Sequence, residues 1–221
     1  MKELLSITVP PVSTLSETME ALQLAAKEHS LILHIDYDRM LQEYQCLWMI
    51  ARARIRLSHF PTGPLTVQTW LRKPSAAVSI RDYALFDGER EIGSAVYSWT
   101  LVHAKERKIV NMKTVAPVWD APTVSPERKD SLRHLTLPEQ LSEAAVWQVS
   151  KTELDENGHV NNVHYIRHAE ELCPGCHNLE VIYNRECFAG ERLFLHCADG
   201  HVVGVKEDGA ESFRARFWRN V

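Results

Sequence analysis

Two stretches of this chain follow one plan, RARIRLSHFPTGPLTVQTW at residues 52–70 and LEVIYNRECFAGERLFLH at residues 179–196. In the first stretch Ala53, Ile55 and Leu57 alternate with arginines, and a period of two predicts a strand with one buried face. Each stretch continues through a turn that contains glycine into a second apolar run. The order strand, turn, strand therefore occurs twice in one chain.

A helix precedes each copy and further strands follow it. Thr14 and Glu17 have the spacing of a capping box, and the apolar residues of segment 15–29 recur at helical intervals. The second helix is predicted over residues 162–172. Two copies of a helix followed by antiparallel strands indicate a duplication. We predict an α+β fold in which each copy wraps a long antiparallel sheet around one central helix, with the two sheets joined edge to edge.

The chain divides into three parts on this interpretation. Residues 1–116 form the N-terminal repeat and residues 144–221 form the C-terminal repeat. Residues 117–143 have the composition of a linker, with prolines among charged residues. These prolines are Pro117, Pro122, Pro126 and Pro138.

The overall composition excludes several classes of protein. A net charge of −4 does not favour nucleic-acid binding, and no apolar run is long enough to span a bilayer. The first residues, MKELLSITVPP, have no apolar core of signal-peptide length. The five cysteines lack the spacing of a disulfide framework, which fits a reducing compartment. We predict a cytoplasmic protein.

One local pattern, CPGCH at residues 173–177, has several interpretations. C-x-x-C-H is the form of c-type haem attachment and also resembles a dithiol redox pair. Haem attachment normally accompanies export, and a redox pair should open a helix, whereas this pair follows one. Zinc binding with His177, His196 or Cys197 stays a weaker alternative, because the second ligand pair lacks metal-site spacing. We interpret the pattern as a helix end followed by a Pro-Gly turn, and we predict no metal and no cofactor.

The most specific pattern is LDENGHVNN at residues 154–162, just before the second predicted helix. It resembles the L-D-x-N-x-H-V-N-N motif of the acyl-acyl-carrier-protein (acyl-ACP) thioesterase family. YNREC at residues 183–187 resembles the Y-x-R-E-C strand of that family, and residues 52–70 resemble a third region, in the same order and spacing. The resemblance implies a tandem (double) hotdog fold and cofactor-independent hydrolysis of fatty acyl-ACP. Short loops and no transit segment favour a bacterial form.

Thioester hydrolysis needs an activated water and a stabilised carbonyl oxygen. The resemblance assigns catalysis to four residues: Asp155, Asn157, His159 and Glu186. Apolar surface or a second carboxylate raises the pKa of a carboxylate and makes it a better base. We therefore predict a water activated by Asp155 and Glu186 together, and which of the two is the base stays open. Asn157, His159 and helix N-terminal amides would polarise the carbonyl.

A second mechanism uses residues of the same motifs. Cys187, His159 and Asn157 would form a Cys-His-Asn arrangement with a covalent acyl-enzyme. A cysteine beside a carboxylate should have a raised thiol pKa, which opposes activation, so we assign Cys187 a supporting role. Two more supporting residues are expected to cap the helix: Asn161 and Asn162. Two histidines on the helix are expected to face solvent: His164 and His168.

The first repeat lacks the D-x-N-x-H motif, because PVSTLSETMEAL at residues 11–22 begins its helix without a histidine. We predict one active site per chain, in the second repeat. The first repeat then supplies the acyl-binding cavity between its helix and sheet, as the family implies. The side chains expected to line it are Leu22, Ala26, Met49 and Trp99.

An acyl-ACP substrate implies an acidic carrier protein as partner, with no nucleic acid and no membrane span. Arginines alternate along two strands, either as a solvated face or as a basic surface for the carrier or for pantetheine phosphate. They are Arg52, Arg54, Arg56, Arg214 and Arg216. The alternative functions are an acyl-CoA thioesterase of the same fold and a non-hydrolytic acyl-binding or dehydratase-like hotdog protein. Exposed sheet edges are consistent with a homodimer.

Overall fold

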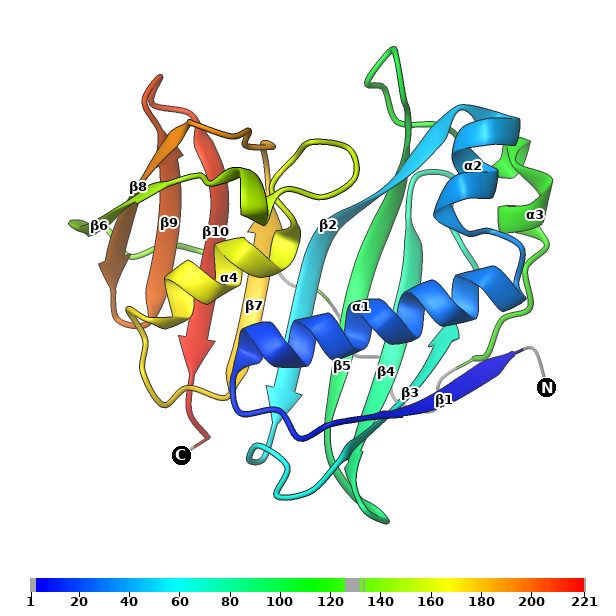
Figure 1. The fold of residues 1–221 in the computed structure, drawn as a ribbon, viewed down its shortest axis with the longest axis horizontal. Coiled ribbons are helices and arrows are strands. Elements are labelled where there is room, and N and C mark those ends of the chain that lie inside the picture. Colours follow the sequence, from blue (N-terminus) through cyan, green and yellow to red (C-terminus); the bar gives the residue numbers. More distant parts are fainter. Residues whose placement is uncertain (1–2, 126–131, 133, 221) are drawn as a thin grey trace.

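Across the residues that the computed structural model describes, 3–125, 132 and 134–220, ten strands form one antiparallel sheet (Figure 1). The strands are β1 (Leu4–Val9), β2 (Cys46–Leu57), β3 (Leu65–Leu71), β4 (Ser79–Asp87), β5 (Arg90–His103), β6 (Ser142–Gln148), β7 (Asn178–Tyr183), β8 (Arg192–Ala198), β9 (His201–Lys206) and β10 (Glu211–Trp218). The helices are α1 (Leu15–Ile32), α2 (Tyr37–Tyr44), α3 (Ala116–Trp119) and α4 (Asn162–Glu170), with 3-10 turns η1 (Met112–Thr114) and η2 (Lys151–Glu153).

The strand order shows the duplication directly. It runs β1-β3-β4-β5-β2 and then β7-β10-β9-β8-β6, so the second half repeats the first in reverse. The two halves meet where β2 pairs antiparallel with β7, from Arg52 opposite Ile182 to Arg56 opposite Asn178. The predicted α+β architecture, two helix-in-sheet repeats joined edge to edge, is confirmed.

Helices α1 and α4 lie on the same face of the sheet and contact each other (Figure 1). Thr14 caps α1 by accepting a hydrogen bond from the N–H of Glu17 at 3.1 Å, as its position in the sequence predicts. Asn161 caps α4 by accepting one from the N–H of Val163 at 3.2 Å. Apolar residues of both helices, such as the fully buried Ile166, join one core with the sheet. Their burial fixes the helices against the strands.

Two strands and two helices were not predicted from the sequence. Strand β1 pairs with β3 at one edge of the sheet, β6 pairs with β8 at the other edge, and α2 connects α1 to β2. Helix α3 packs Val118 into a cluster with Leu33 and Ile35, so the start of the predicted linker lies against the first repeat. Strand β6 begins at Ser142, and residues 126–131 and 133 of the predicted linker lie outside the described residues. The division at residues 117 and 143 stays a prediction.

Within the described parts of the chain, no helix has both the length and the apolar character needed to cross a membrane.

Candidate active site

A cavity of about 1030 Å³ lies where the two repeats meet. The first repeat contributes walls from α1, α2, β2, β4 and β5, including the apolar side chains of Leu24 and Ile50. The second repeat contributes residues of segment 155–162 and the residues that follow β7. A large space with apolar walls and a few convergent polar groups is typical of a ligand site.

Asp155 holds together the loop that precedes α4. Its Oδ1 accepts hydrogen bonds from the N–H groups of Asn157, at 2.8 Å, and His159, at 3.1 Å. The N–H of Asp155 donates to the carbonyl of His159 at 2.7 Å. Gly158 has a φ of +77°, a conformation that disfavours other residues. The loop therefore presents the side chains of Asn157 and His159 to the cavity.

Glu186 lies between a histidine and an arginine. Its carboxylate pairs with Arg107 from the segment after β5, and its Oε1 lies 3.4 Å from Nδ1 of His159. The second contact has the distance of an ion pair but not the geometry of a hydrogen bond. Oε1 is therefore buried without a hydrogen-bond donor among the described residues. A carboxylate oxygen in this state, in the wall of a cavity, is suited to accept a proton from water.

Tyr37, the first residue of α2, fixes the amide of Asn157. Its hydroxyl donates a hydrogen bond to Oδ1 of Asn157. Burial, together with the charges of Glu156 and Asp155, raises the pKa of Tyr37, so the phenol keeps its proton and remains a donor. With Oδ1 engaged, the NH₂ group of Asn157 is the part available to a ligand.

The N-terminus of α4 is open toward the cavity. The side-chain oxygen of Asn161 accepts a hydrogen bond from the N–H of Val163. Its main-chain carbonyl accepts one from the N–H of His164. The N–H of Asn162 donates to none of the described residues, and both asparagines line the cavity. A free N–H at the positive end of a helix is suited to bind a developing oxyanion.

The N-terminus of α1 is closed by a residue of the other repeat. Glu170, at the end of α4, accepts hydrogen bonds from the N–H groups of Leu15, at 2.9 Å, and Ser16, at 3.3 Å. The hydroxyl of Ser16 also donates to this carboxylate. Burial raises the pKa of Glu170 despite these donors. A carboxylate of the protein therefore occupies the position that a ligand anion would take.

Cys187 is fully buried and does not line the cavity. Its Sγ lies 3.1 Å from Oγ of Ser212, and its N–H donates to the hydroxyl of Tyr165 at 3.0 Å. Burial is the main cause that raises the pKa of the Cys187 thiol. The direction agrees with the expectation from the sequence, although the principal cause is desolvation rather than a neighbouring carboxylate.

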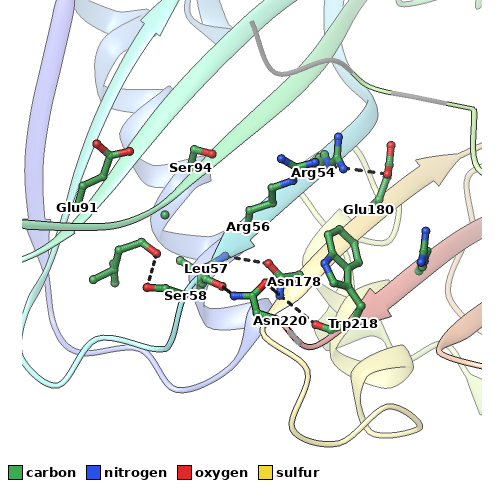
Figure 2. A pocket seen from close by; sticks show the side chains of 13 residues that line it. Arg54, Arg56, Leu57, Ser58, Glu91, Ser94, Asn178, Glu180, Trp218 and Asn220 are labelled. Atoms are coloured by element: carbon green, nitrogen blue, oxygen red, sulfur yellow. Dashed lines mark hydrogen bonds and ion pairs between the residues drawn. The ribbon is translucent and has the colours of Figure 1, made fainter. Parts of the chain in front are cut away.

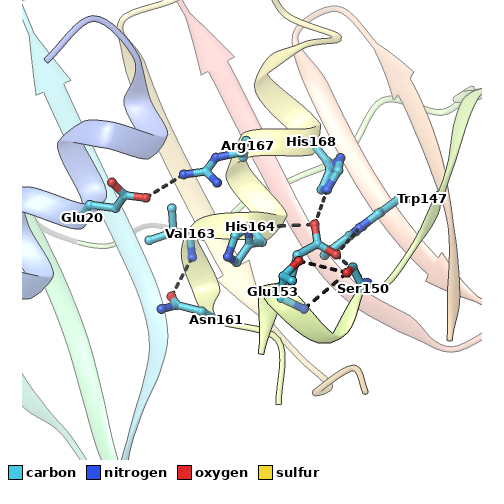
Figure 3. A network of polar contacts seen from close by, with 10 residues as sticks. Glu20, Trp147, Ser150, Glu153, Asn161, Val163, His164, Arg167 and His168 are labelled. Carbon is cyan, nitrogen blue, oxygen red and sulfur yellow. Dashed lines mark hydrogen bonds and ion pairs between the residues drawn. The ribbon is translucent and has the colours of Figure 1, made fainter. Parts of the chain in front are cut away.

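The prediction that His164 and His168 face solvent is wrong (Figure 3). His168 donates to Glu153 at 2.7 Å and stacks on Trp147 with ring centroids 4.3 Å apart, and His164 lies 3.9 Å from Glu153. Glu153 also accepts hydrogen bonds from the Ser150 N–H and the Trp147 indole. Burial raises the pKa of Glu153, but the hydrogen bonds that it accepts have the larger effect together. The pKa of Glu153 is therefore below its usual range.

The cavity contains three of the four predicted acyl-binding side chains: Ala26, Met49 and Trp99. Leu22 is fully buried in the core between helix and sheet and does not reach the cavity. All four predicted catalytic residues line it, although the structure pairs Glu186 with His159 rather than with Asp155. Their catalytic and binding roles remain proposals.

The sequence did not reveal two residues of the first repeat that contact this cluster, Tyr37 and Arg107. Neither belongs to a motif. The aromatic residue that opens α2 after the capping Asp36 is an ordinary helix start, and Arg107 lies in a charged turn with a φ of +56°. Only the packing of the two repeats brings them to Asn157 and Glu186.

A second hollow, of about 470 Å³, lies on the sheet face away from the helices (Figure 2). Arg54 and Arg216 approach the ring of Trp218 there, at 5.9 and 5.7 Å from its centroid, and Glu180 lies 3.8 Å from Arg54. Arg56 also lines this hollow, so the arginines of the sheet alternate with carboxylates and an aromatic ring. The choice between a solvated face and a partner surface stays open.

The CPGCH segment forms the turn after α4, which ends at Glu170. Gly175 has a φ of +75°, which fits the Pro-Gly turn expected from the sequence. Burial raises the pKa of Cys173 to about 12, which disfavours its thiolate.

Residues 9–115 match the family model of the acyl-ACP thioesterase N-terminal domain. A chloroplastic oleoyl-acyl carrier protein thioesterase of Coriandrum sativum is 24% identical over 168 residues, which are 66% of this chain and 46% of that protein. The oleoyl-acyl carrier protein thioesterase 2 of Arabidopsis thaliana is 25% identical over 169 residues, again 46% of its length. The chain thus spans about half the length of these curated relatives.

Solved structures agree with the fold over nearly the whole chain. An acyl-ACP thioesterase from Bacteroides thetaiotaomicron superposes with a TM-score of 0.83 at 22% identity, covering 97% of this chain and 96% of that one. The 12:0-ACP thioesterase from Umbellularia californica superposes with a TM-score of 0.75 at 17% identity, with the same coverage. The tandem hotdog fold and the resemblance to acyl-ACP thioesterases are confirmed.

Proposed function

On the premise that residues 9–115 match the N-terminal domain of acyl-ACP thioesterases, we propose that the chain hydrolyses fatty acyl-ACP to a free fatty acid and holo-ACP. The observation that carries the proposal is the convergence of Glu186, His159, Asn157 and the free N–H of Asn162 on one cavity with apolar walls. These groups come from separate segments of the chain. Together they supply the base and the donors that thioester hydrolysis needs.

Glu186 is the proposed base. Its Oε1 lacks a hydrogen-bond donor, while the other carboxylate oxygen is held by Arg107. Oε1 takes a proton from a water molecule as the water oxygen attacks the thioester carbon. The intermediate then releases the thiolate, which receives that proton from Glu186, so the carboxylate is regenerated.

The carbonyl oxygen becomes an oxyanion during attack. The N–H of Asn162 and the NH₂ group of Asn157 are the proposed donors to it, and Tyr37 keeps that amide in the required orientation. Asp155 acts indirectly, by holding the loop that presents Asn157 and His159. This division of roles makes Glu186 rather than Asp155 the base.

An acidic carrier protein is the proposed partner, with no nucleic acid involved. Three cations line the cavity beside Glu186: Arg107, Arg185 and Lys206. Positive charge at this part of the cavity would attract an acidic carrier or the phosphate of its pantetheine arm. A cytoplasmic location and a homodimer stay predictions.

The test is hydrolysis of acyl-ACP and acyl-CoA substrates with matched acyl chains, followed by analysis of the free acids. A higher kcat/KM on acyl-ACP supports the proposal, and a higher value on acyl-CoA favours the acyl-CoA alternative. Binding without release of free thiol from either donor contradicts hydrolysis and favours an acyl-binding protein.

The covalent alternative is tested with Cys187→Ala. Because Cys187 is buried outside the cavity, the variant should keep kcat within about an order of magnitude, the loss expected from a disturbed core. Near-complete loss of turnover, together with an acyl-enzyme trapped in the wild type, would establish Cys187 as the nucleophile instead.

A further inference from the structure

A buried arginine lies in the wall of the cavity, on the side of the first repeat. Arg81 of β4 is only 4% exposed, and it lines the cavity together with Ser79 and Leu71. The proposed hydrolysis makes no use of it. Charged side chains are rarely buried to this extent without a partner of opposite charge.

The contacts of Arg81 leave most of its donors unused. Nη1 lies 2.8 Å from Nδ1 of His29 and donates to the hydroxyl of Thr69 at 3.2 Å. Neither Nε nor Nη2 donates to any of the described residues. The carboxylate of the adjacent Asp82 binds Arg72 through both of its oxygens, at 2.5 and 2.6 Å.

The charge of Arg81 is therefore not balanced within the described protein. Nδ1 of His29 must accept from Nη1, since guanidinium nitrogens are donors only, so this contact adds no negative charge. Burial lowers the pKa of Arg81, but a guanidinium stays protonated in proteins. The unused edge, Nε with Nη2, has the fork geometry that binds a carboxylate through two hydrogen bonds.

The position of Arg81 separates it from the catalytic cluster. One row of paired residues crosses four neighbouring strands. Ile182 of β7 lies opposite Arg52 of β2. Arg52 lies opposite Ser98 of β5, and Ser98 lies opposite Ile80 of β4. Arg81 follows Ile80, so it lies three strand spacings, about 14 Å, from β7. Glu186 comes just after the end of β7, which places the two groups at different parts of one cavity.

We infer that the cavity takes acyl chains that carry a carboxylate at the end remote from the thioester, and that Arg81 binds this carboxylate. The inference rests on the proposed function, because it assumes a thioester located beside Glu186. It narrows the substrate class from fatty acyl-ACP to ACP monothioesters of α,ω-dicarboxylic acids.

The test compares ACP monothioesters of α,ω-dicarboxylic acids with fatty acyl-ACP of equal chain length. The wild type should show the higher kcat/KM on the dicarboxylic series. Arg81→Met should lower that value by about 10- to 100-fold, the loss of hydrogen bonds to a charged group, and leave the fatty acyl series within about 3-fold. Lys27→Met removes a different cation from the cavity wall and should leave the ratio of the two series unchanged.

A wild type that favours the fatty acyl series, or a ratio that Arg81→Met does not alter, would overturn the inference. A preference for ω-hydroxyacyl chains over ω-carboxyacyl chains would also overturn the assignment of a carboxylate. If Arg81→Met does not fold, Arg81→Lys keeps the charge without the fork and should reduce the preference by about 10-fold. An unchanged preference in Arg81→Lys contradicts binding through that fork.

Calorimetry with the free dicarboxylic acid and the free fatty acid separates this inference from the proposed function. If the protein binds the diacid through Arg81 but hydrolyses no thioester, the inference about Arg81 stands and the proposed hydrolysis is refuted. If the protein hydrolyses fatty acyl-ACP and the dicarboxylic series at equal rates, the proposed function stands and the inference is refuted.

Discussion

The two repeats begin their central helices in opposite states. The N-terminus of α1 is filled, because Glu170 accepts hydrogen bonds from the N–H groups of Leu15 and Ser16. The N-terminus of α4 leaves the N–H of Asn162 without a partner among the described residues and faces the cavity. The same fold thus contains a closed helix N-terminus in the first repeat and an open one in the second repeat. The carboxylate that closes the first, Glu170, belongs to the second repeat.

This difference explains why we expect one active site in a chain with two repeats. A helix N-terminus attracts an anion wherever it is free. At α1 the anion is the carboxylate of Glu170, which links the two repeats. At α4 the helix N-terminus is left to bind a substrate oxygen. The first repeat still takes part in the proposed chemistry, since Tyr37 and Arg107 contact Asn157 and Glu186.

The largest expected effect is at the open end. Glu186→Gln removes the proposed base while keeping the shape of the side chain, and kcat on acyl-ACP should fall by about 10²- to 10⁴-fold. The matched control is Glu170→Gln at the closed end, which should keep kcat within about 3-fold. Steady-state rates of the two variants measure the contrast, and equal losses would show that the two helix ends do not differ in function.

A smaller effect is expected where the first repeat supports the second. Tyr37→Phe removes the hydroxyl that donates to Asn157, so the amide loses its fixed orientation and kcat should fall by about 10-fold. Tyr44→Phe, at the other end of α2, serves as the control and should retain the wild-type rate. A Tyr37→Phe enzyme with full activity contradicts the role given to the first repeat.

The smallest effect on turnover is expected at Glu153, which anchors α4 away from the cavity. Glu153→Gln should lower the free energy of unfolding by about 1 kcal/mol at neutral pH, because the ionised form accepts the hydrogen bonds of His168 and Ser150. The pKa of Glu153 is lowered in the folded state, so its contribution is present above the ordinary glutamate pKa and disappears as the pH falls through the lowered value.

Urea unfolding of wild type and Glu153→Gln at several pH values checks this sign. The difference between the two proteins should shrink in acid, and kcat should stay within about 2-fold at neutral pH. A difference that grows as the pH falls contradicts the assigned direction of the pKa shift.

The repeated pattern of helix and strands was readable from the sequence because alternation in strands such as β2 and the cap at Thr14 are local signals. The convergence of the motif residues was implied by family resemblance and is supported by the structure. Edge strands β1 and β6 were missed, since their pairing depends on partners far along the chain. His168 was predicted to be solvated because a helical position does not reveal a stacking partner such as Trp147.

The roles within the site depended on contacts that no local pattern contains. Asp155 and Glu186 look equivalent as acids in the sequence, yet one accepts N–H groups of its own loop and the other has an oxygen without a donor. The carboxylate of Glu170 reaches α1 from a position 155 residues away from Leu15. Only the tertiary fold distinguishes these three acids.

The most direct test of the single open helix end is the number of acyl sites per chain. Isothermal titration with a non-hydrolysable acyl-ACP analogue should give one bound equivalent per chain, and Glu170→Gln should not add another. A stoichiometry of two in the wild type would mean that α1 also receives a substrate, which contradicts the account.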